Sequence, residues 1–268
     1  MQLRLASGNG PITRTIRRTP LRDASPSEIP LIDVSPMFSD SLADRQGVAR
    51  KVHDAATNNG FFYISNHGIP AEVTDSAHVA CLDFFRQDMD VKMKTDANKG
   101  SFHNGYRAPD TQRLNPDEGV DIRESYTIRY DPASIRPLQI RQASRSKRPN
   151  FQLFTILWQD SNGGLQVLNR EGQWIGARPV EGTFVVNIAD YLQRITNDRY
   201  VSTVHRAQNW SGRERVSMPF FWGFGLHESC GVLDSCVAEG EEKKYGEIRC
   251  IDWFNRRIGN MLDLSEEK

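Results

Sequence analysis

The feature that most constrains the fold is a series of short apolar segments separated by turns over residues 154–224. The first two segments, 154–160 and 165–169, flank the turn Ser161–Gly164. Further strands are expected over 174–177 and 183–190, around His205, and over 215–224. Short strands at regular spacing with glycine turns are typical of a jelly roll or barrel. This half of the chain therefore predicts a mainly β structure.

The N-terminal half adds helices to this β structure. Apolar residues recur at helical spacing over 42–59 and 71–87, and Gly60 ends the first of these helices. Strands are expected over 29–34 and 124–130, and 60–70 is expected to be a strand that ends in a turn, with a polar loop over 95–119. The expected fold class is mainly β with flanking helices.

Charge and composition limit the class of partner. The 268 residues contain 34 Lys and Arg against 34 Asp and Glu, so no global field favours nucleic acid or an anionic membrane. A small-molecule substrate is the expected partner. The chain has no apolar run of about 20 residues and no secretory h-region, and its four cysteines lack metal-ribbon spacing. We expect a cytoplasmic monomer with reduced thiols.

Two basic segments differ from the rest of the chain. The first 22 residues carry five arginines before the first acid, Asp23; this favours a disordered tail, with a transit peptide as the alternative. Residues 132–150 hold five cations and no acid, and they lack apolar periodicity. The expected division is a disordered basic tail (1–25), an α/β section (26–131), a basic junction (132–150), a β core (151–226) and a C-terminal extension (227–268).

Three side chains form a candidate site. His205 lies on an extended segment, and Arg215 and Ser217 follow on another. Side chains two apart on a strand share a face, so a guanidinium and a hydroxyl would point together, as suits a small carboxylate. From these residues alone, His205 could equally be a core histidine, and the other two an ordinary pair on a solvated face.

Several stretches carry a family resemblance: 60–70, 158–167, 182–190, 196–206 and 215–221. Together they resemble the isopenicillin N synthase-like iron(II)/2-oxoglutarate-dependent oxygenases, a family that includes flavonol synthase, gibberellin oxidases and fungal tailoring enzymes. The resemblance covers 29–258 except the junction. It implies a double-stranded β-helix (jelly-roll) core and oxidative tailoring of a small, secondary-metabolite-like substrate with Fe(II) and 2-oxoglutarate as cofactors.

The resemblance also implies roles for residues. The family binds iron through a His-x-Asp pair and a distal His, a facial triad, and His205 matches the distal His. Arg215 and Ser217 match the Arg-x-Ser that holds the far carboxylate of 2-oxoglutarate. The His-x-Asp places hold Arg148 and Asn150. A guanidinium cannot ligate iron and an amide offers only a neutral carbonyl, so neither is expected to ligate.

The chain departs from the family in a second way. The family has several tens of residues before His-x-Asp, with a helical section and an Asn-x-Tyr strand, whereas this chain has residues 132–150. The jelly-roll core is therefore expected to be incomplete, iron binding to fail and the chain as written to be inactive. Substitute ligands are hard to find, since the other histidines lie in helices, turns or the C-terminal extension: His53, His67, His78, His103 and His227.

Three interpretations remain open at this point. The sequence could contain a gene-model error or come from a truncated allele. It could instead be a diverged, catalytically inactive binding protein that keeps Arg215 and Ser217 as an anion clamp. The third possibility is a working oxygenase with substitute metal ligands.

Overall fold

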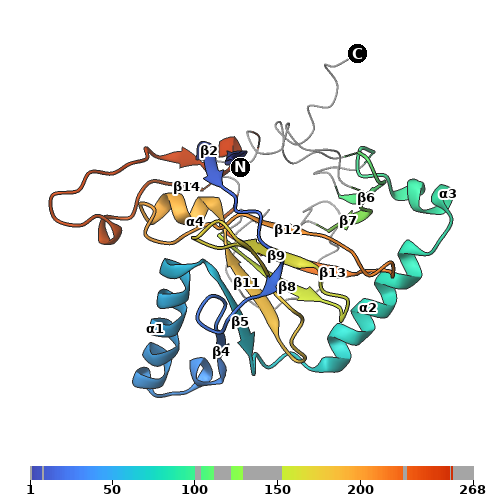
Figure 1. Cartoon of the computed structure of the whole chain (residues 1–268), viewed down its shortest axis with the longest axis horizontal. Helices are drawn as coiled ribbons and strands as arrows, with labels where there is room; N and C mark the ends of the chain where they lie inside the picture. The colour runs from blue at the N-terminus through green and yellow to red at the C-terminus, as the bar shows by residue number, and fades with distance from the viewer. Residues whose placement is uncertain are drawn as a thin grey trace, which may run out of the picture. The chain divides into compact units, whose positions relative to one another are not determined.

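A computed structural model describes residues 2–7, 9–99, 104–111, 122–128, 153–225, 228–253 and 255 (Figure 1). The elements in chain order are β1 (Gln2–Ser7), β2 (Gly10–Thr15), β3 (Arg22–Asp23), β4 (Leu31–Asp33), η1 (Ser35–Phe38), α1 (Leu42–Asn58), β5 (Phe61–Ser65), α2 (Ala71–Phe85), α3 (Met89–Lys92), η2 (Met93–Thr95), β6 (Gly105–Arg107), β7 (Ser125–Thr127), β8 (Phe154–Gln159), β9 (Leu165–Leu168), β10 (Trp174–Gly176), β11 (Phe184–Ile188), α4 (Asp190–Ile195), β12 (His205–Ala207), β13 (Ser217–Trp222), β14 (Ser229–Cys230), η4 (Asp234–Cys236) and β15 (Ile248–Arg249).

The chain forms two compact units that interleave along the sequence. The first comprises Met1–His78, Gln152–Trp222 and Gly231–Gly246, and the second comprises Val79–Phe151, Gly223–Cys230 and Glu247–Lys268. The division predicted from the sequence is linear, and it assigns 227–268 to one extension. In the structure that stretch is shared, because 231–246 packs with the first unit.

Two sheets form the first unit. One has five strands in the order β13-β8-β11-β5-β4, and the other has four in the order β12-β9-β10-β3. Figure 1 shows β13, β8 and β11 side by side. The two sheets enclose a core that includes Phe61, Val167, Ile175 and Val185. These short, paired strands confirm the mainly β class expected from the glycine turns.

Helix α1 covers the other face of the five-stranded sheet. Its Val48 and Ala55 are buried against Ile32, Phe62 and Val186. The helix begins at Ser41, whose hydroxyl accepts from the backbone N–H of Asp44 (3.4 Å), a capping contact typical of helix starts. Its bounds match the periodicity to within one residue.

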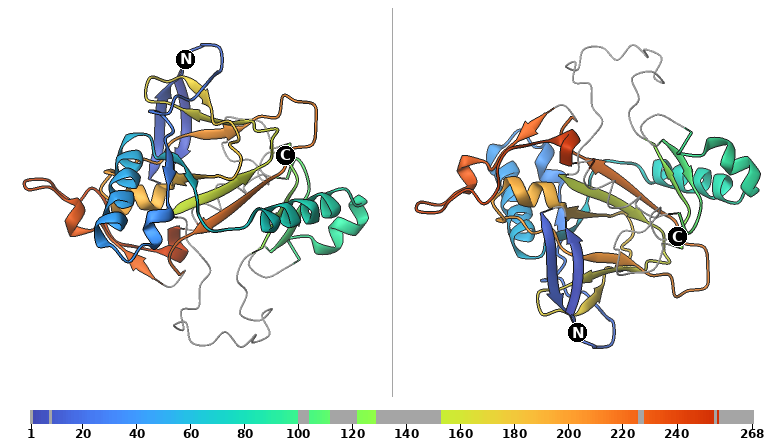
Figure 2. Two further views of the ribbon diagram at one scale, coloured as in Figure 1. Left: turned by 90° about the horizontal axis from the view of Figure 1, so that it is seen from below. Right: turned by 90° about the horizontal axis from the view of Figure 1, so that it is seen from above.

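The first fifteen residues differ from the disordered tail that their composition predicts. Strands β1 and β2 pair antiparallel from Gln2↔Thr15 to Ser7↔Gly10 (Figure 2). Gly10 has φ +112°, a conformation that glycine adopts without a steric penalty. The backbone N–H of Arg17 donates to the carbonyl of Gly172 (2.7 Å), and β3 pairs with β10. Backbone pairing thus orders a segment of low hydrophobicity, which composition alone cannot reveal.

The second unit contains a small sheet of its own. Strand β6 pairs with β7, so the predicted loop over 95–119 contains a short strand. Lys92 is buried and forms an ion pair with Glu124 (2.8 Å).

The four cysteines are free thiols. None of the helices in the described ranges has the length and apolar content needed to cross a bilayer.

Candidate active site

His205 lies at the start of β12 and faces the space between the two sheets of the first unit. It is opposite Val167 of β9 in the antiparallel register, and directly opposite residues share a face. Val167 belongs to the core between the sheets, and the His205 ring contacts Phe61 edge-on at 5.2 Å between centroids. Arg206 points the other way, where its Nε donates to Gln166 Oε1 (2.9 Å).

The hydrogen bond of His205 determines which ring nitrogen can act as a ligand. Its Nδ1 lies 2.9 Å from the carbonyl of Thr203, and a carbonyl can only accept. Nδ1 therefore carries the proton, which leaves the Nε2 lone pair for a ligand or metal. Burial lowers the pKa of His205, while the Thr203 carbonyl and Asp190 partly oppose this effect. The neutral imidazole needed for ligation is therefore favoured at neutral pH.

The strand that carries His205 is open to solvent on one side. All three residues of β12 are exposed, although protein surrounds the His205 ring closely enough to lower its pKa. Among the described strands, β12 lies at one edge of its sheet, and β13 lies at one edge of the other. On β13, Phe220, Phe221 and Trp222 are exposed as well. Both sheets thus end on an exposed strand beside the candidate site.

Arg215 is held by the glycine turn that follows β8. Its Nε donates to the carbonyl of Gly163, and its Nη1 donates to Ser217 Oγ (3.3 Å). A Cβ on Gly164 would lie 2.4 Å from the carbonyl oxygen of Gln208 and 3.3 Å from Arg215 Nε. Only glycine permits this close approach. The structure therefore brings together Arg215 and Ser217, as the strand pattern predicts, although Arg215 itself precedes β13.

Asp160 anchors the backbone between these two residues. Its Oδ2 accepts from the N–H of Val216 (2.6 Å), and the Asp160 N–H donates to the Val216 carbonyl (3.1 Å). Its Oδ1 accepts from the N–H of Asn162 (3.0 Å). Burial lowers the pKa of Arg215, and the Asp160 charge opposes this; the guanidinium stays protonated at neutral pH.

The imidazole and the guanidinium lie at opposite ends of β9. The N–H of Gln208 donates to the carbonyl of Gly164 (2.8 Å), and Gly164 adjoins Arg215. His205 is opposite Val167, three residues further along. At about 3.3 Å per strand residue, the two positions are separated by about 10 Å along the strand. Ser217 is on the inner face too, since it is opposite Gln159, two residues from the core-packed Leu157.

The described residues do not supply a metal site around His205. Within these residues, no group of three or more His, Cys, Asp or Glu side chains could hold a metal ion. Arg148 and Asn150, with the junction 132–150, lie outside the described residues, as do His103 and His227. The other histidines contact aromatic rings instead: His53 with Tyr200, His67 with Phe184, and His78 with Trp158.

Asp160 and Gly164 are site residues that sequence reasoning misses in these roles. The Gly163-Gly164 pair is visible as a turn, but its contact with Arg215 depends on the fold.

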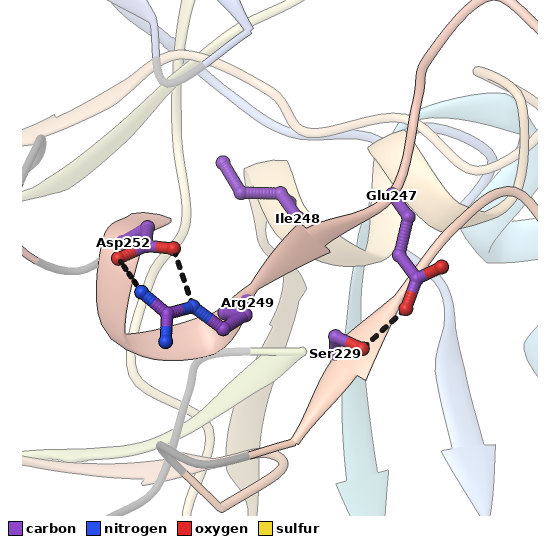
Figure 3. Close-up of a pocket in the computed structure, with 5 residues that line it drawn as sticks. All are labelled: Ser229, Glu247, Ile248, Arg249 and Asp252. Atoms are coloured by element: carbon purple, nitrogen blue, oxygen red, sulfur yellow. Dashed lines mark hydrogen bonds and ion pairs between the residues drawn. The ribbon is translucent and has the colours of Figure 1, made fainter.

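A separate pocket of about 410 Å³ lies in the second unit (Figure 3). There Arg249 pairs with Asp252 (2.8 Å) and Ser229 with Glu247, so its polar groups satisfy one another.

The chain is similar to known oxygenases in sequence. Residues 29–151 match the family "non-haem dioxygenase in morphine synthesis N-terminal", and 124–223 match the 2OG-Fe(II) oxygenase superfamily. The chain is 52% identical over 360 positions to the 2-oxoglutarate-Fe(II) type oxidoreductase ppzC of Metarhizium majus, covering 100% of this chain and 96% of the relative. It is 28% identical over 312 positions to hxnY, an oxidoreductase of the same type from Emericella nidulans, covering 85% and 88%.

Solved structures share the fold. A full-length Neurospora crassa protein crystallised with alpha-KG has a TM-score of 0.71 at 22% identity, covering 86% of this chain and 96% of that protein. The rice dioxygenase for auxin oxidation has a TM-score of 0.67 at 20% identity, covering 87% of this chain and 95% of that protein.

The 360 aligned positions with the Metarhizium majus relative exceed the 268 residues of this chain by 92. At least 92 positions of the relative are therefore aligned with gaps in this chain.

Proposed function

Because the chain belongs to the 2-oxoglutarate/Fe(II) oxygenase superfamily, we propose that its fold serves the oxidative tailoring of a small, secondary-metabolite-like molecule. We further propose that the chain as written keeps the carboxylate clamp for 2-oxoglutarate and lacks most of the metal site. In this family, iron with bound 2-oxoglutarate supplies the oxidising chemistry, while the protein orients the reactants and excludes water. The observation that carries the proposal is a supported Arg215–Ser217 pair at one end of β9, with a single imidazole, His205, at the other and no metal-binding group among the described residues.

The clamp suits the far carboxylate of 2-oxoglutarate. Arg215 uses its Nε and one Nη1 hydrogen within the protein, which leaves N–H groups that can donate to a ligand. Ser217 Oγ accepts a hydrogen bond from Arg215, and its own O–H can donate a hydrogen bond to a carboxylate oxygen. Two donors fixed on neighbouring residues recognise a planar carboxylate with defined geometry.

The residues around His205 do not fit a metal ion as well as the clamp fits a carboxylate. A facial triad requires three donors on one face of the ion, and the described residues place only His205 Nε2 there. We propose that Arg148 and Asn150 occupy the other two ligand positions, where they do not ligate. We derive no oxidation step for this chain, because the donor set is incomplete.

An internal deletion accounts for both observations. A jelly roll has eight strands in two sheets. In the described part of the chain, β8–β13 contribute six strands, three to each sheet, while β3, β4 and β5 extend the sheets at their other edges. Among the described residues, the sheets end at β12, whose three residues are exposed, and at β13, whose last four residues are exposed. These open edges and the 92 gap positions support the absence of two core strands just before residue 151. In that case, residues 132–150 replace a segment that carries the His-x-Asp pair.

Sequencing the transcript across codons 132–150 tests this proposal. Recovery of the missing segment with His-x-Asp would assign the full oxygenase activity to that product. A transcript that encodes the chain as written would favour the second candidate function, a dicarboxylate-binding protein without turnover. The specific observation for this candidate is that the clamp keeps its supporting contacts from Asp160, Gly163 and Gly164.

A protein-level test uses the double variant Arg148→His with Asn150→Asp. Iron content and succinate production are measured for the wild-type chain and the variant. We expect the wild-type chain to bind no stoichiometric iron. The variant should gain iron but remain poorly active, because the Asn-x-Tyr strand and the helical section would still be absent. Tight binding of one Fe(II) with turnover by the wild-type chain would refute the assignment of Arg148 and Asn150.

A further inference from the structure

Gln159 is a polar residue of the clamp region that the proposed function does not use. It ends β8 directly opposite Ser217 of β13. It shares the inner face with Leu157, which packs against the core between the sheets. Gln159 and Ser217 are therefore side by side on the face where Arg215 donates to Ser217.

One end of the Gln159 amide is fixed by the opposite sheet. Its Nε2 donates to the carbonyl of Ala177 (3.2 Å), a buried residue that follows β10. Reversing the amide would place two carbonyl oxygens against each other, since neither can donate. The contact with Ala177 therefore determines that Oε1 is the end of the amide that remains for another partner.

That oxygen has no partner in the described part of the chain. Gln159 Oε1 is buried and accepts no hydrogen bond there. A buried carbonyl without a donor is unfavourable, because it loses the water that solvates it in the unfolded chain. The nearby hydroxyl of Ser217 has a single proton to donate. A carboxylate held by Ser217 accepts that hydrogen bond, and an ionised carboxylate has no donor for Gln159 Oε1.

We propose that Gln159 is a specificity-determining residue, which makes the clamp accept a terminal carboxamide as well as a carboxylate. This inference rests on the proposed function, because it concerns the same clamp. The amide oxygen of the ligand accepts from Arg215 and Ser217, and its N–H donates to Gln159 Oε1. The ligand class is thus a short 2-oxo acid whose far end carries an acceptor and a donor together.

Two ligands and two variants test this role. Metal-free protein is titrated with 2-oxoglutarate and with its terminal amide, 2-oxoglutaramate, by ligand-observed NMR, and the ratio of the two Kd values (amide over acid) is compared. Gln159→Met removes the acceptor, so the ratio should rise about tenfold, the equivalent of one hydrogen bond. Gln159→Glu keeps an acceptor and adds a negative charge, so it should weaken 2-oxoglutarate more and lower the ratio.

The two Gln159 variants should change the Kd ratio in opposite directions, which distinguishes a role in specificity from a purely structural role. Both variants lose the bond to Ala177, so a purely structural effect would weaken both ligands equally and leave the ratio unchanged; that result would overturn the inference. Arg215→Met serves as the reference. If it abolishes binding of both ligands while neither Gln159 variant moves the ratio, only the role of Gln159 fails. If the wild-type chain binds neither ligand, the proposed clamp fails as well.

Discussion

The two ends of β9 differ in how completely the described residues support them. At the clamp end, Arg215 donates to the Gly163 carbonyl, and the Asp160 carboxylate accepts from the backbone N–H of Val216, between Arg215 and Ser217. At the other end, the His205 ring has one hydrogen-bond partner among the described residues, the Thr203 carbonyl, and it lies on an exposed edge strand. The clamp is built from two paired strands, β8 with its following turn and β13 with the residue before it, whereas a metal site needs donors from a further strand.

Under the proposed function, the carboxylate clamp and the metal ligands are two halves of a co-substrate site that can be separated. A carboxylate clamp needs one cation and one hydroxyl from the same strand region, so it survives a change elsewhere in the chain. A facial triad gathers ligands from distant positions, so the loss of one segment removes most of it. The predictions below test the contrast between a supported clamp and an unsupported metal end.

The largest effect should come from removing the guanidinium. Arg215→Met should weaken 2-oxoglutarate binding at least about 30-fold, because truncating a charged partner in a desolvated contact costs about 2–5 kcal/mol. Titration of metal-free protein measures it. Arg213→Met, which removes an exposed cation two residues earlier, is the matched control and should leave Kd unchanged. Equal losses in both variants would mean that the net local charge, rather than the clamp geometry, binds the ligand.

Asp160 should contribute to stability as well as to the clamp. Asp160→Ala leaves two backbone N–H groups without their carboxylate acceptor, those of Val216 and Asn162. The free energy of unfolding should fall by about 1–3 kcal/mol, as measured by urea denaturation. Asp160→Asn keeps one acceptor oxygen and should lose less. An alanine variant as stable as the wild type would show that the clamp backbone does not depend on this residue.

Acid should weaken the segment that leads to His205. Burial would raise the pKa of Asp198, but hydrogen bonds from Gln193, Tyr245 and Lys244 outweigh this and lower it. A lowered folded pKa gives stability that is present above the unfolded value of 3.8 and is lost as the pH falls through the folded pKa.

The variant Asp198→Asn measures this contribution. Its deficit in Tm relative to the wild type should be constant near neutral pH and should shrink as the pH falls below about 3.8. Asp54→Asn changes an exposed acid on α1 and serves as the control. A deficit that persists unchanged in strong acid would assign the effect to packing rather than to the carboxylate charge.

The smallest effect on stability should come from a substitution on β13, the exposed strand at the edge of the five-stranded sheet. Phe220→Lys places a charge on an exposed position of β13, and charged edges resist pairing with other chains. Light scattering should show less aggregation, with a change in unfolding free energy within about 0.5 kcal/mol. Leu42→Lys, at an exposed position of α1, should not reduce aggregation. Equal benefit from both variants would point to general solubility rather than to the edge strand.

The sequence predicted the elements that periodicity and glycine turns encode. The β8–β9 turn at Gly163-Gly164 and helix α1 were recoverable because local spacing determines them. The β1–β2 hairpin was not, since its order comes from backbone pairing and not from apolar side chains. Asp160 and Gln159 were not assigned site roles either: their partners, Val216 and Ala177, are distant in sequence, and only the sheet register brings them together.

The most direct test of the central claim is a calorimetric titration of the wild-type chain with 2-oxoglutarate, in the absence and presence of Fe(II) under anaerobic conditions. A clamp without a metal site predicts weak binding with the same Kd in both conditions, because the carboxylate contact survives without iron and chelation does not. An increase in affinity of tenfold or more on addition of Fe(II) would contradict this account, since it would require metal ligands beside His205.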